Sequence, residues 1–197
     1  MVAVNLIKFL DLGYDINKLH LIGHSLGGQC IGLVSRHLKK TSNDRYFIPR
    51  LYALDPAAPA FETNNTLSKA LEWASPWNTD FPMISRDDAE YVQIIHTSAG
   101  TYGIIESRGH VDFFPNSGAN QHGCDLEITD DVCSHRRAWL YYQESVKVLN
   151  TFSAVKCESY DEFKSGACKG HERGFMGFSD DTSARGNFYL VTHSNPY

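Results

Sequence analysis

The stretch Gly23-His24-Ser25-Leu26-Gly27 decides the fold class of this chain. It follows a short apolar run, residues 19–22, that is typical of a buried strand. It precedes residues 28–40, where apolar side chains recur at the spacing of one helix face. Glycines on both sides of Ser25 allow a sharp turn between the strand and the helix, which exposes the serine oxygen. The free N–H groups at the start of the helix then face the place where an oxyanion would form. Ser25 is therefore the candidate nucleophile.

The remaining elements alternate between strand and helix, which predicts a mostly parallel sheet with helices on its faces. Together with the Gly-x-Ser-x-Gly turn, this predicts an α/β-hydrolase fold. The loop-rich stretch 62–88 carries aromatic residues that form either a hydrophobic surface wall or ordinary packing under a long loop. We expect strands at 19–23, 50–54, 91–97, 110–114 and 188–192, and helices at 2–11, 28–40, 67–72 and 134–152.

The composition excludes several classes of protein. With 197 residues, of which 42% are hydrophobic and 21% charged, the chain fits one globular domain or one large piece of one. The net charge of -5 supplies no basic patch, so nucleic acid is not an expected partner. No run of about 18 or more apolar residues occurs, so we expect no membrane span. The first ten residues lack the basic region and cleavage site of a signal peptide, which favours a helix there.

Four of the five cysteines form two close pairs, Cys124 with Cys133 and Cys157 with Cys168. Such local pairs suit two small loops closed by disulfides, and hence a secreted protein. The alternative is a set of free buried thiols in a cytosolic enzyme. A zinc site is disfavoured because no Cys-x-x-Cys motif occurs. Cys30 falls in the middle of a predicted helix, where we expect a buried, unreactive thiol.

A serine nucleophile needs a base, and the base needs a carboxylate to orient it. In α/β-hydrolases the acid follows the serine in the chain, and the histidine follows the acid. Asp55 is the preferred acid because it comes directly after the strand at 50–54, at an edge where such sheets collect functional groups. Its alternative role is to cap a turn before Pro56. Asp88, in a polar run, and Asp112, inside a strand, are weaker candidates.

Nine histidines compete for the role of base. His135 is preferred because it follows Cys133 and opens a predicted helix, so that a disulfide would fix its position. His24 lies inside the turn and is expected to point away from the serine, in a packing role. His96 and His110 lie in predicted strands, where buried or hydrogen-bonding histidines are more typical.

Five blocks of sequence together resemble the pancreatic lipase family, which includes secreted triacylglycerol lipases, phospholipases A1 and insect neutral lipases. The blocks occur in the family's order and span roughly residues 19–192. They are Gly-His-Ser-Leu-Gly-Gly (23–28), Leu-Asp-Pro-Ala-Ala-Pro-Ala-Phe (54–61), Val-Gln-Ile-Ile-His-Thr (92–97), Gly-His-Val-Asp-Phe-Phe-Pro-Asn-Ser-Gly (109–118) and Cys-Ser-His-Arg-Arg (133–137).

The resemblance implies a serine hydrolase that cleaves lipid esters through an acyl-enzyme. It implies that Ser25 is the nucleophile, Asp55 the triad acid and His135 the base. The Leu26 N–H is then one donor of the oxyanion hole. The alternative is an inactive, lipid-binding protein like the insect yolk proteins, which resemble this family. The intact set of three triad residues favours the enzyme.

The resemblance also implies the remaining expectations. The disulfides are Cys124–Cys133, which closes the lid loop, and Cys157–Cys168. The protein is expected to be secreted, to bind a lipid substrate at an interface and to contact a membrane or lipid-droplet surface, with its oligomeric state left open. No cofactor and no metal are expected. Some members carry calcium on the loop after the triad acid, but only Asp88 lies where a ligand would be expected.

The length of the lid is a clue to the substrate and leaves both phospholipids and acylglycerols open. The segment between the lid cysteines, residues 125–132, and the loop 97–109 are both short, as in phospholipases A1 of this family. A small lid leaves room for a polar head group. Four acidic residues in this lid would disfavour an anionic head group: Asp125, Glu127, Asp130 and Asp131.

The chain also departs from the family pattern. In the family, an oxyanion loop and several strands precede the elbow, whereas here the chain begins about twenty residues before it. We therefore expect residues 1–197 to be a partial catalytic domain that lacks its N-terminal strands, with no C-terminal lipid-binding β-sandwich domain. Without the second oxyanion donor, the isolated chain is expected to be weakly active and poorly soluble.

Overall fold

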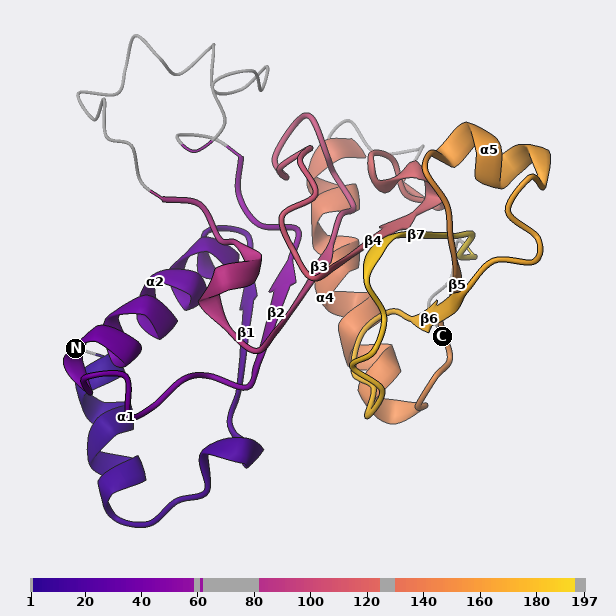
Figure 1. The fold of residues 1–197 in the computed structure, drawn as a ribbon. Helices are drawn as coiled ribbons and strands as arrows, with labels where there is room; N and C mark the ends of the chain where they lie inside the picture. Colours follow the sequence, from indigo (N-terminus) through magenta and orange to yellow (C-terminus); the bar gives the residue numbers. More distant parts are fainter. Residues whose placement is uncertain (1, 59–60, 62–81, 125–129, 194–197) are drawn as a thin grey trace, which may run out of the picture.

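A seven-stranded, mostly parallel sheet runs through the molecule (Figure 1). The computed structural model describes residues 2–58, 61, 82–124 and 130–193. In these residues the strand order is β1-β2-β3-β4-β7-β5-β6, with parallel pairing from β1 to β7 and antiparallel pairing of β5 with β7 and β6. The strands are β1 (His20–His24), β2 (Arg50–Leu54), β3 (Tyr91–Ile95), β4 (Val111–Pro115), β5 (Ser153–Lys156), β6 (Arg173–Phe175) and β7 (Gly186–Leu190).

Helices cover both faces of the sheet, and each face has its own hydrophobic core. Leu51 of β2 belongs to the cluster that includes Leu38 of helix α2 (Leu26–Thr41). Its neighbour Tyr52 belongs to the cluster that includes Tyr141 of helix α4 (Asp130–Lys147). This alternation is what a strand buried on both faces requires. The predicted α/β-hydrolase architecture is therefore confirmed. The helices are α1 (Val2–Asp11), α2 (Leu26–Thr41), α4 (Asp130–Lys147) and α5 (Tyr160–Ser165), with 3₁₀ turns η1 (Ile16–Lys18), η2 (Arg86–Asp88) and η3 (Asn116–Gly118).

The predicted elements differ from the structure mainly in the last third of the chain. The predicted strands lie within about two residues of β1, β2, β3, β4 and β7, and α1 has its predicted bounds. Helix α4 begins and ends earlier than 134–152, because acidic residues suit its first turn and Asn150, with φ 59°, takes the chain out of the helical conformation. Strands β5 and β6 and helix α5 were missed, since these short elements carry no strong periodicity. The predicted helix at 67–72 lies outside the described residues.

Both expected disulfides are present. The Cα atoms are 5.6 Å apart in Cys124–Cys133 and 5.8 Å apart in Cys157–Cys168, within the usual range for a bridge. The alternatives of free thiols and a zinc site are therefore excluded for these four residues. Cys30 is unpaired, but the prediction that it is buried is wrong, because it is exposed on α2. The buried stripe of that helix passes through Ile31, Ser35 and Leu38, and Cys30 lies beside it.

The turn between β1 and α2 is tight and strained. Ser25 has φ 57° and ψ −125°, a conformation that non-glycine residues rarely adopt. Its N–H donates to the carbonyl of Leu54 over 3.0 Å, and its carbonyl accepts the N–H of Gly28 over 2.9 Å. A Cβ atom at Gly23 would lie 2.8 Å from the Gly28 nitrogen and closer still to the carbonyl of Gly27. The turn therefore requires glycine at position 23.

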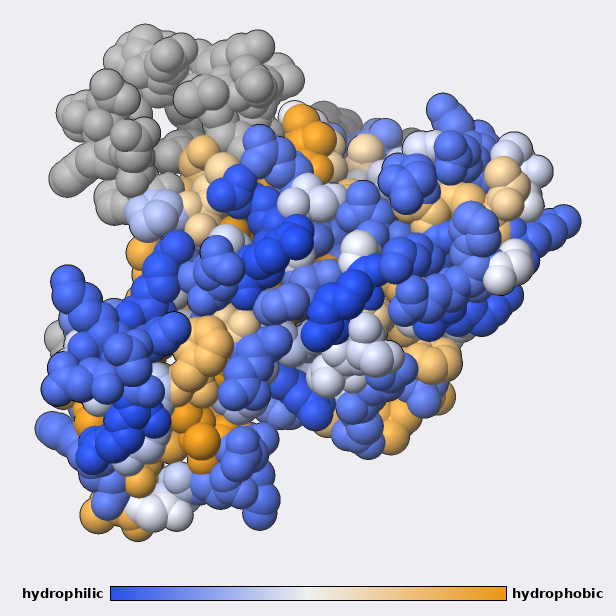
Figure 2. All heavy atoms as spheres, viewed as in Figure 1, coloured by the Kyte–Doolittle hydropathy of each residue, from blue (hydrophilic) through white to orange (hydrophobic). Residues whose placement is uncertain are grey.

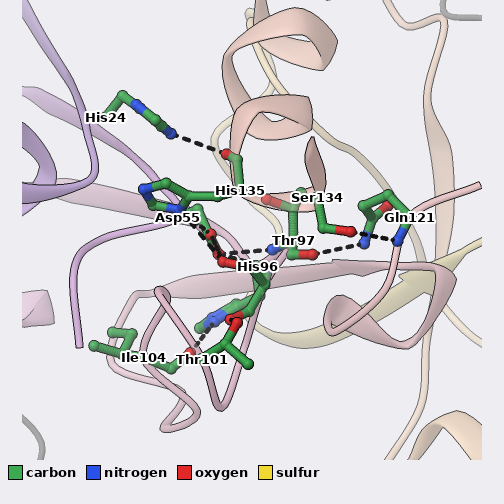
Figure 3. Close-up of polar contacts among 10 residues, drawn as sticks. His24, Asp55, His96, Thr97, Thr101, Ile104, Gln121, Ser134 and His135 are labelled. Atoms are coloured by element: carbon green, nitrogen blue, oxygen red, sulfur yellow. Dashed lines mark hydrogen bonds and ion pairs between the residues drawn. The ribbon is translucent and has the colours of Figure 1, made fainter. Parts of the chain in front are cut away.

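A buried ion pair ties β3 to β4. His96, directly after β3, places Nε2 2.8 Å from Oδ1 of Asp112 in β4. Its Nδ1 lies 3.0 Å from the carbonyl of Ile104 (Figure 3). A carbonyl oxygen and an ionised carboxylate only accept hydrogens, so beside an ionised Asp112 both ring nitrogens carry protons and the ring is an imidazolium. Burial by itself lowers the pKa of His96, but the hydrogen bond and charge of Asp112 outweigh that effect and leave the pKa raised. The N–H of Gly109 donates to the same carboxylate over 2.9 Å.

Hydrophilic side chains cover most of the face seen in Figure 2, and apolar side chains interrupt them in separate patches. Across the described ranges, no helix has the length and apolar character needed to cross a membrane.

The glycine requirement of the turn can be tested with a matched pair. Gly23→Ala should lower the free energy of unfolding by more than about 3 kcal/mol, because its Cβ meets main-chain atoms that cannot move aside. Gly27→Ala should be neutral or stabilising by up to about 1 kcal/mol, since its Cβ meets open space at a helical position. Urea unfolding of both variants measures the difference, and equal stabilities would contradict the role given to Gly23.

The cysteine assignments predict a labelling pattern. A thiol-alkylating reagent should modify Cys30 alone in the native, non-reduced protein, because the other four sulfurs are bonded. Mass spectrometry of a non-reduced digest should recover Cys124 linked to Cys133 and Cys157 linked to Cys168. A linked peptide that contains Cys30 would refute the assignment.

The His96–Asp112 pair predicts a pH-dependent stability. Because the folded-state pKa of His96 lies above its ordinary value of about 6.5, its proton stabilises the fold fully below about pH 6.5. That contribution is lost as the pH rises through the folded-state pKa, at about 1.4 kcal/mol per unit of pKa difference.

The comparison is between the wild type and the double variant His96→Gln with Asp112→Asn, which removes both charges. The stability advantage of the wild type should shrink as the pH rises from about 6 to about 9, measured by urea unfolding. The exposed His171→Gln serves as the control and should show no such trend. A pH-independent advantage would argue against a buried imidazolium.

Candidate active site

The candidate nucleophile and acid lie at adjacent strand ends. The sheet register pairs His24 of β1 with Leu54 of β2, and Leu54 with Ile95 of β3. Ser25 and Asp55, the residues after β1 and β2, therefore reach the same edge of the sheet. The hydrogen bond from the Ser25 N–H to the Leu54 carbonyl fixes the two strand ends to one another. Ser25 is only partly buried, so its side chain remains accessible.

The Asp55 carboxylate is completely buried and receives four hydrogen bonds. Oδ1 accepts the N–H groups of Thr97, over 2.8 Å, and Ser98, over 3.1 Å. Oδ2 lies 2.6 Å from Nδ1 of His135 (Figure 3). The same oxygen accepts the Ser98 hydroxyl. A Cβ atom at Gly103 would overlap this carboxylate, so only glycine allows the loop to approach it. Four donors compensate the cost of burying the charge.

Two aromatic rings and one carboxylate contact the ring of His135. It stacks on Tyr102, with ring centroids 5.3 Å apart, and contacts His24, with centroids 4.4 Å apart. Because Nδ1 faces the Asp55 carboxylate, Nδ1 carries the proton and Nε2 is left to accept another. His135 lies in the second turn of α4, so the prediction that it opens the helix is wrong. The disulfide at Cys133 nevertheless anchors the turn before it.

His24 takes a larger part in the site than a packing role. Its Nε2 lies 2.9 Å from the main-chain carbonyl of His135, to which it donates (Figure 3). Burial is the main cause that lowers the pKa of His24, and the nearby His135 lowers it further. A neutral His24 keeps a second positive charge away from the candidate base. The position of His24 next to the serine could have suggested a role in the site. The sequence does not tell, however, on which side of a tight turn a side chain lies.

The loop that carries the donors to Asp55 is itself fixed at several points. The carbonyl of Ser98 accepts the N–H of Gly103 over 3.1 Å, which closes the loop. The N–H of Ile104 donates to the carbonyl of Pro56 over 3.0 Å, and its carbonyl receives Nδ1 of His96. His96 therefore binds one end of the loop, at Ile104, and the other end donates hydrogen bonds to Asp55.

The other candidate acids and bases have partners away from Ser25. Asp88 lies in η2, 3.4 Å from the guanidinium of Arg36, and burial raises the pKa of Asp88. Asp112 binds His96, which has no ring nitrogen left to accept a proton. Nδ1 of His110 accepts a main-chain N–H of β3. Among the candidate acids and bases, Asp55 and His135 are the pair that meets beside the serine turn.

Three exposed apolar side chains lie in segments of the chain that also carry site residues. Leu26, next to Ser25, is 58% exposed, Ile105 is 52% exposed and Val132, one turn before His135, is 37% exposed. The lid segment 125–129 and most of the aromatic stretch 62–88 lie outside the described residues. In the described part of the chain, one group of metal-ligand types occurs: Cys157, Glu162 and Cys168. Its cysteines are joined in a disulfide, which leaves no thiolate to bind a metal.

Comparisons with known proteins agree with this architecture. The model of the Lipase family matches residues 1–197. A phospholipase A1 of Vespula squamosa is 39% identical over 137 residues, which cover 70% of this chain and 40% of that protein. A phospholipase A1 of Vespa crabro is 34% identical over 194 residues, which cover 96% of this chain and 58% of that protein. A pancreatic triacylglycerol lipase of Oryctolagus cuniculus is 30% identical over 179 residues, covering 80% of this chain and 34% of that protein.

The chain therefore spans between about a third and three-fifths of the length of these relatives. The family match covers the serine turn, the Asp55–His135 pair and both disulfides. The mostly parallel sheet with helices on both faces is the fold that such a match leads one to expect. This chain belongs to the lipase family.

Proposed function

We propose that the protein is a serine carboxylic-ester hydrolase that cleaves lipid esters, phospholipids or acylglycerols, through an acyl-enzyme. The observation that carries the proposal is the 2.6 Å hydrogen bond between Asp55 and Nδ1 of His135, at the sheet edge that also bears the Ser25 turn. Relatives named phospholipase A1 and triacylglycerol lipase support the substrate class.

In the proposed mechanism, Nε2 of His135 removes the hydroxyl proton of Ser25 while the serine oxygen attacks the ester carbonyl. The negative charge of Asp55 stabilises the imidazolium that forms. The imidazolium then protonates the departing alcohol, which leaves an acyl group on Ser25. Water, deprotonated by the same nitrogen, attacks the acyl-enzyme and releases the fatty acid.

The start of α2 stabilises the oxyanion in this mechanism. Leu26 is the first residue of the helix, where main-chain N–H groups have no carbonyl one turn before them. The helix dipole adds positive potential at the same end. A single donor of this kind typically contributes about a hundred- to a thousandfold in rate.

We further propose that the site works at a lipid–water interface outside the cell, and that residues 1–197 form part of a single lipase catalytic domain. The exposed Leu26, Ile105 and Val132 would contact acyl chains at such an interface, because apolar side chains gain free energy on leaving water. The two disulfides support secretion, since such bridges persist in oxidising compartments.

The triad is tested in the full-length protein by substitution and turnover. Asp55→Asn should reduce kcat by about 10⁴-fold, and Ser25→Ala by about 10⁶-fold, with a short-chain nitrophenyl ester as substrate. Asp161→Asn, a substitution of an exposed aspartate in α5, should leave turnover unchanged. Turnover that survives Ser25→Ala would refute the proposed nucleophile.

The substrate class is tested by offering phosphatidylcholine and a triacylglycerol as emulsions to the same protein. Preferential release of fatty acid from phosphatidylcholine is expected from the short lid. If the protein bound lipid vesicles tightly and hydrolysed no ester, it would be a lipase-like binding protein and the enzymatic proposal would fail.

A further inference from the structure

We propose that Ser98 is a positioning residue whose hydroxyl aligns the Asp55 carboxylate with the Nδ1–H of His135. The inference rests on the proposed function, because it assigns to Ser98 a part in the same site. Ser98 is not part of the Gly-x-Ser-x-Gly motif, and its place in the chain, next to Thr97 after β3, carries no catalytic signature.

The hydroxyl of Ser98 has two partners, and both belong to the proposed triad. Its single hydrogen points to Oδ2 of Asp55, the oxygen that also binds His135. Its oxygen lies 3.3 Å from Nδ1 of His135 and can accept a second, weaker hydrogen bond from the Nδ1–H that Asp55 accepts over 2.6 Å. Ser98 and Asp55 are fully buried, and the His135 side chain is 11% exposed. Water therefore has no room to replace the hydroxyl without rearrangement.

The main chain of Ser98, and not its hydroxyl, builds the loop. The N–H of Ser98 donates to Oδ1 of Asp55, and its carbonyl accepts the N–H groups of Thr101 and Gly103. Those hydrogen bonds are the same for any residue at position 98. In the described part of the chain, the side chain hydrogen-bonds only with Asp55 and His135, and Ser98→Ala removes those two contacts and leaves the main-chain hydrogen bonds in place.

Two effects of the hydroxyl follow. It fixes the rotation of the carboxylate about its last bond, so that Oδ2 stays in line with Nδ1 of His135. It also withdraws electron density from Oδ2, because a carboxylate oxygen that accepts two donors binds each less strongly. Without the hydroxyl, the carboxylate attracts the imidazolium proton more strongly but in a less defined direction.

The test compares Ser98→Ala with wild type in the full-length protein. Its kcat for the nitrophenyl ester should fall about ten- to a hundredfold, the effect of one hydrogen bond to a charged group. KM should stay unchanged, since Ser98 has no surface toward the substrate. The acidic limb of the pH–activity profile should move to higher pH. In proton NMR of the resting protein, the downfield resonance of the His135 Nδ1 proton should move as well.

Two further variants separate positioning from packing. Ser35→Ala also removes a fully buried hydroxyl, one that donates to the carbonyl of Asp88 on the far side of α2, and it should change stability alone. Ser98→Thr keeps the hydroxyl and should restore most of kcat and the wild-type pH profile. If Ser98→Ala fails to fold, Ser98→Cys, which fills the space with a weaker donor, takes its place with the same expected directions.

The proposal is overturned if Ser98→Ala keeps the wild-type kcat, pH profile and Nδ1 resonance, or if it differs from wild type only in stability, as Ser35→Ala does. Its failure is distinct from failure of the proposed function. A wild type without Ser25-dependent ester hydrolysis refutes the function, and the NMR comparison then still decides whether Ser98 aligns the two groups.

Discussion

The buried Asp55 carboxylate is the group on which the arrangement of this molecule depends. A charge removed from water is costly unless donors surround it, and here the donors come from two separate parts of the chain. Two are main-chain N–H groups after β3, one is the Ser98 hydroxyl and one is the ring of His135 on α4. The need to satisfy one carboxylate therefore brings together the ends of two strands, a loop and a helix on the opposite face from α2.

Two histidine–aspartate pairs lie close together in this structure and do different chemistry. In His96–Asp112, the second ring nitrogen is occupied by the carbonyl of Ile104 and the ring is fully buried, so the histidine is a fixed cation. In His135–Asp55, Nε2 has no such role in the ring's support, and the side chain is 11% exposed. The two pairs contain the same residue types, and what differs is whether the second ring nitrogen of the histidine has an acceptor. His96 has one and is structural, whereas His135 is the candidate base.

The two pairs are also connected. His96 binds the carbonyl of Ile104, at the end of the loop whose start, Thr97 and Ser98, supplies three donors to Asp55. Above the ring of His135, Tyr102 of the same loop provides a stacking surface. The His96 side chain therefore supports the loop that carries donors to Asp55 through its hydrogen bond to the carbonyl of Ile104.

The sequence by itself predicted the serine turn, the parallel part of the sheet and the two disulfides, and it proposed Asp55 and His135 as the candidate acid and base. The turn and the sheet depend on local patterns: Gly23 is needed where a side chain would overlap the main chain, and β2 and β3 are mostly apolar because helices cover both faces. Only the tertiary structure decided the outward position of Cys30, the antiparallel β5 and β6, the bounds of α4, and the contacts of His24 and Ser98. Each of these depends on partners distant in the chain, since 111 residues separate His24 from the carbonyl it binds and 43 separate Ser98 from Asp55. Local periodicity carries no information about such partners, because a hydrogen bond between distant segments is set by how the sheet and helices pack around it.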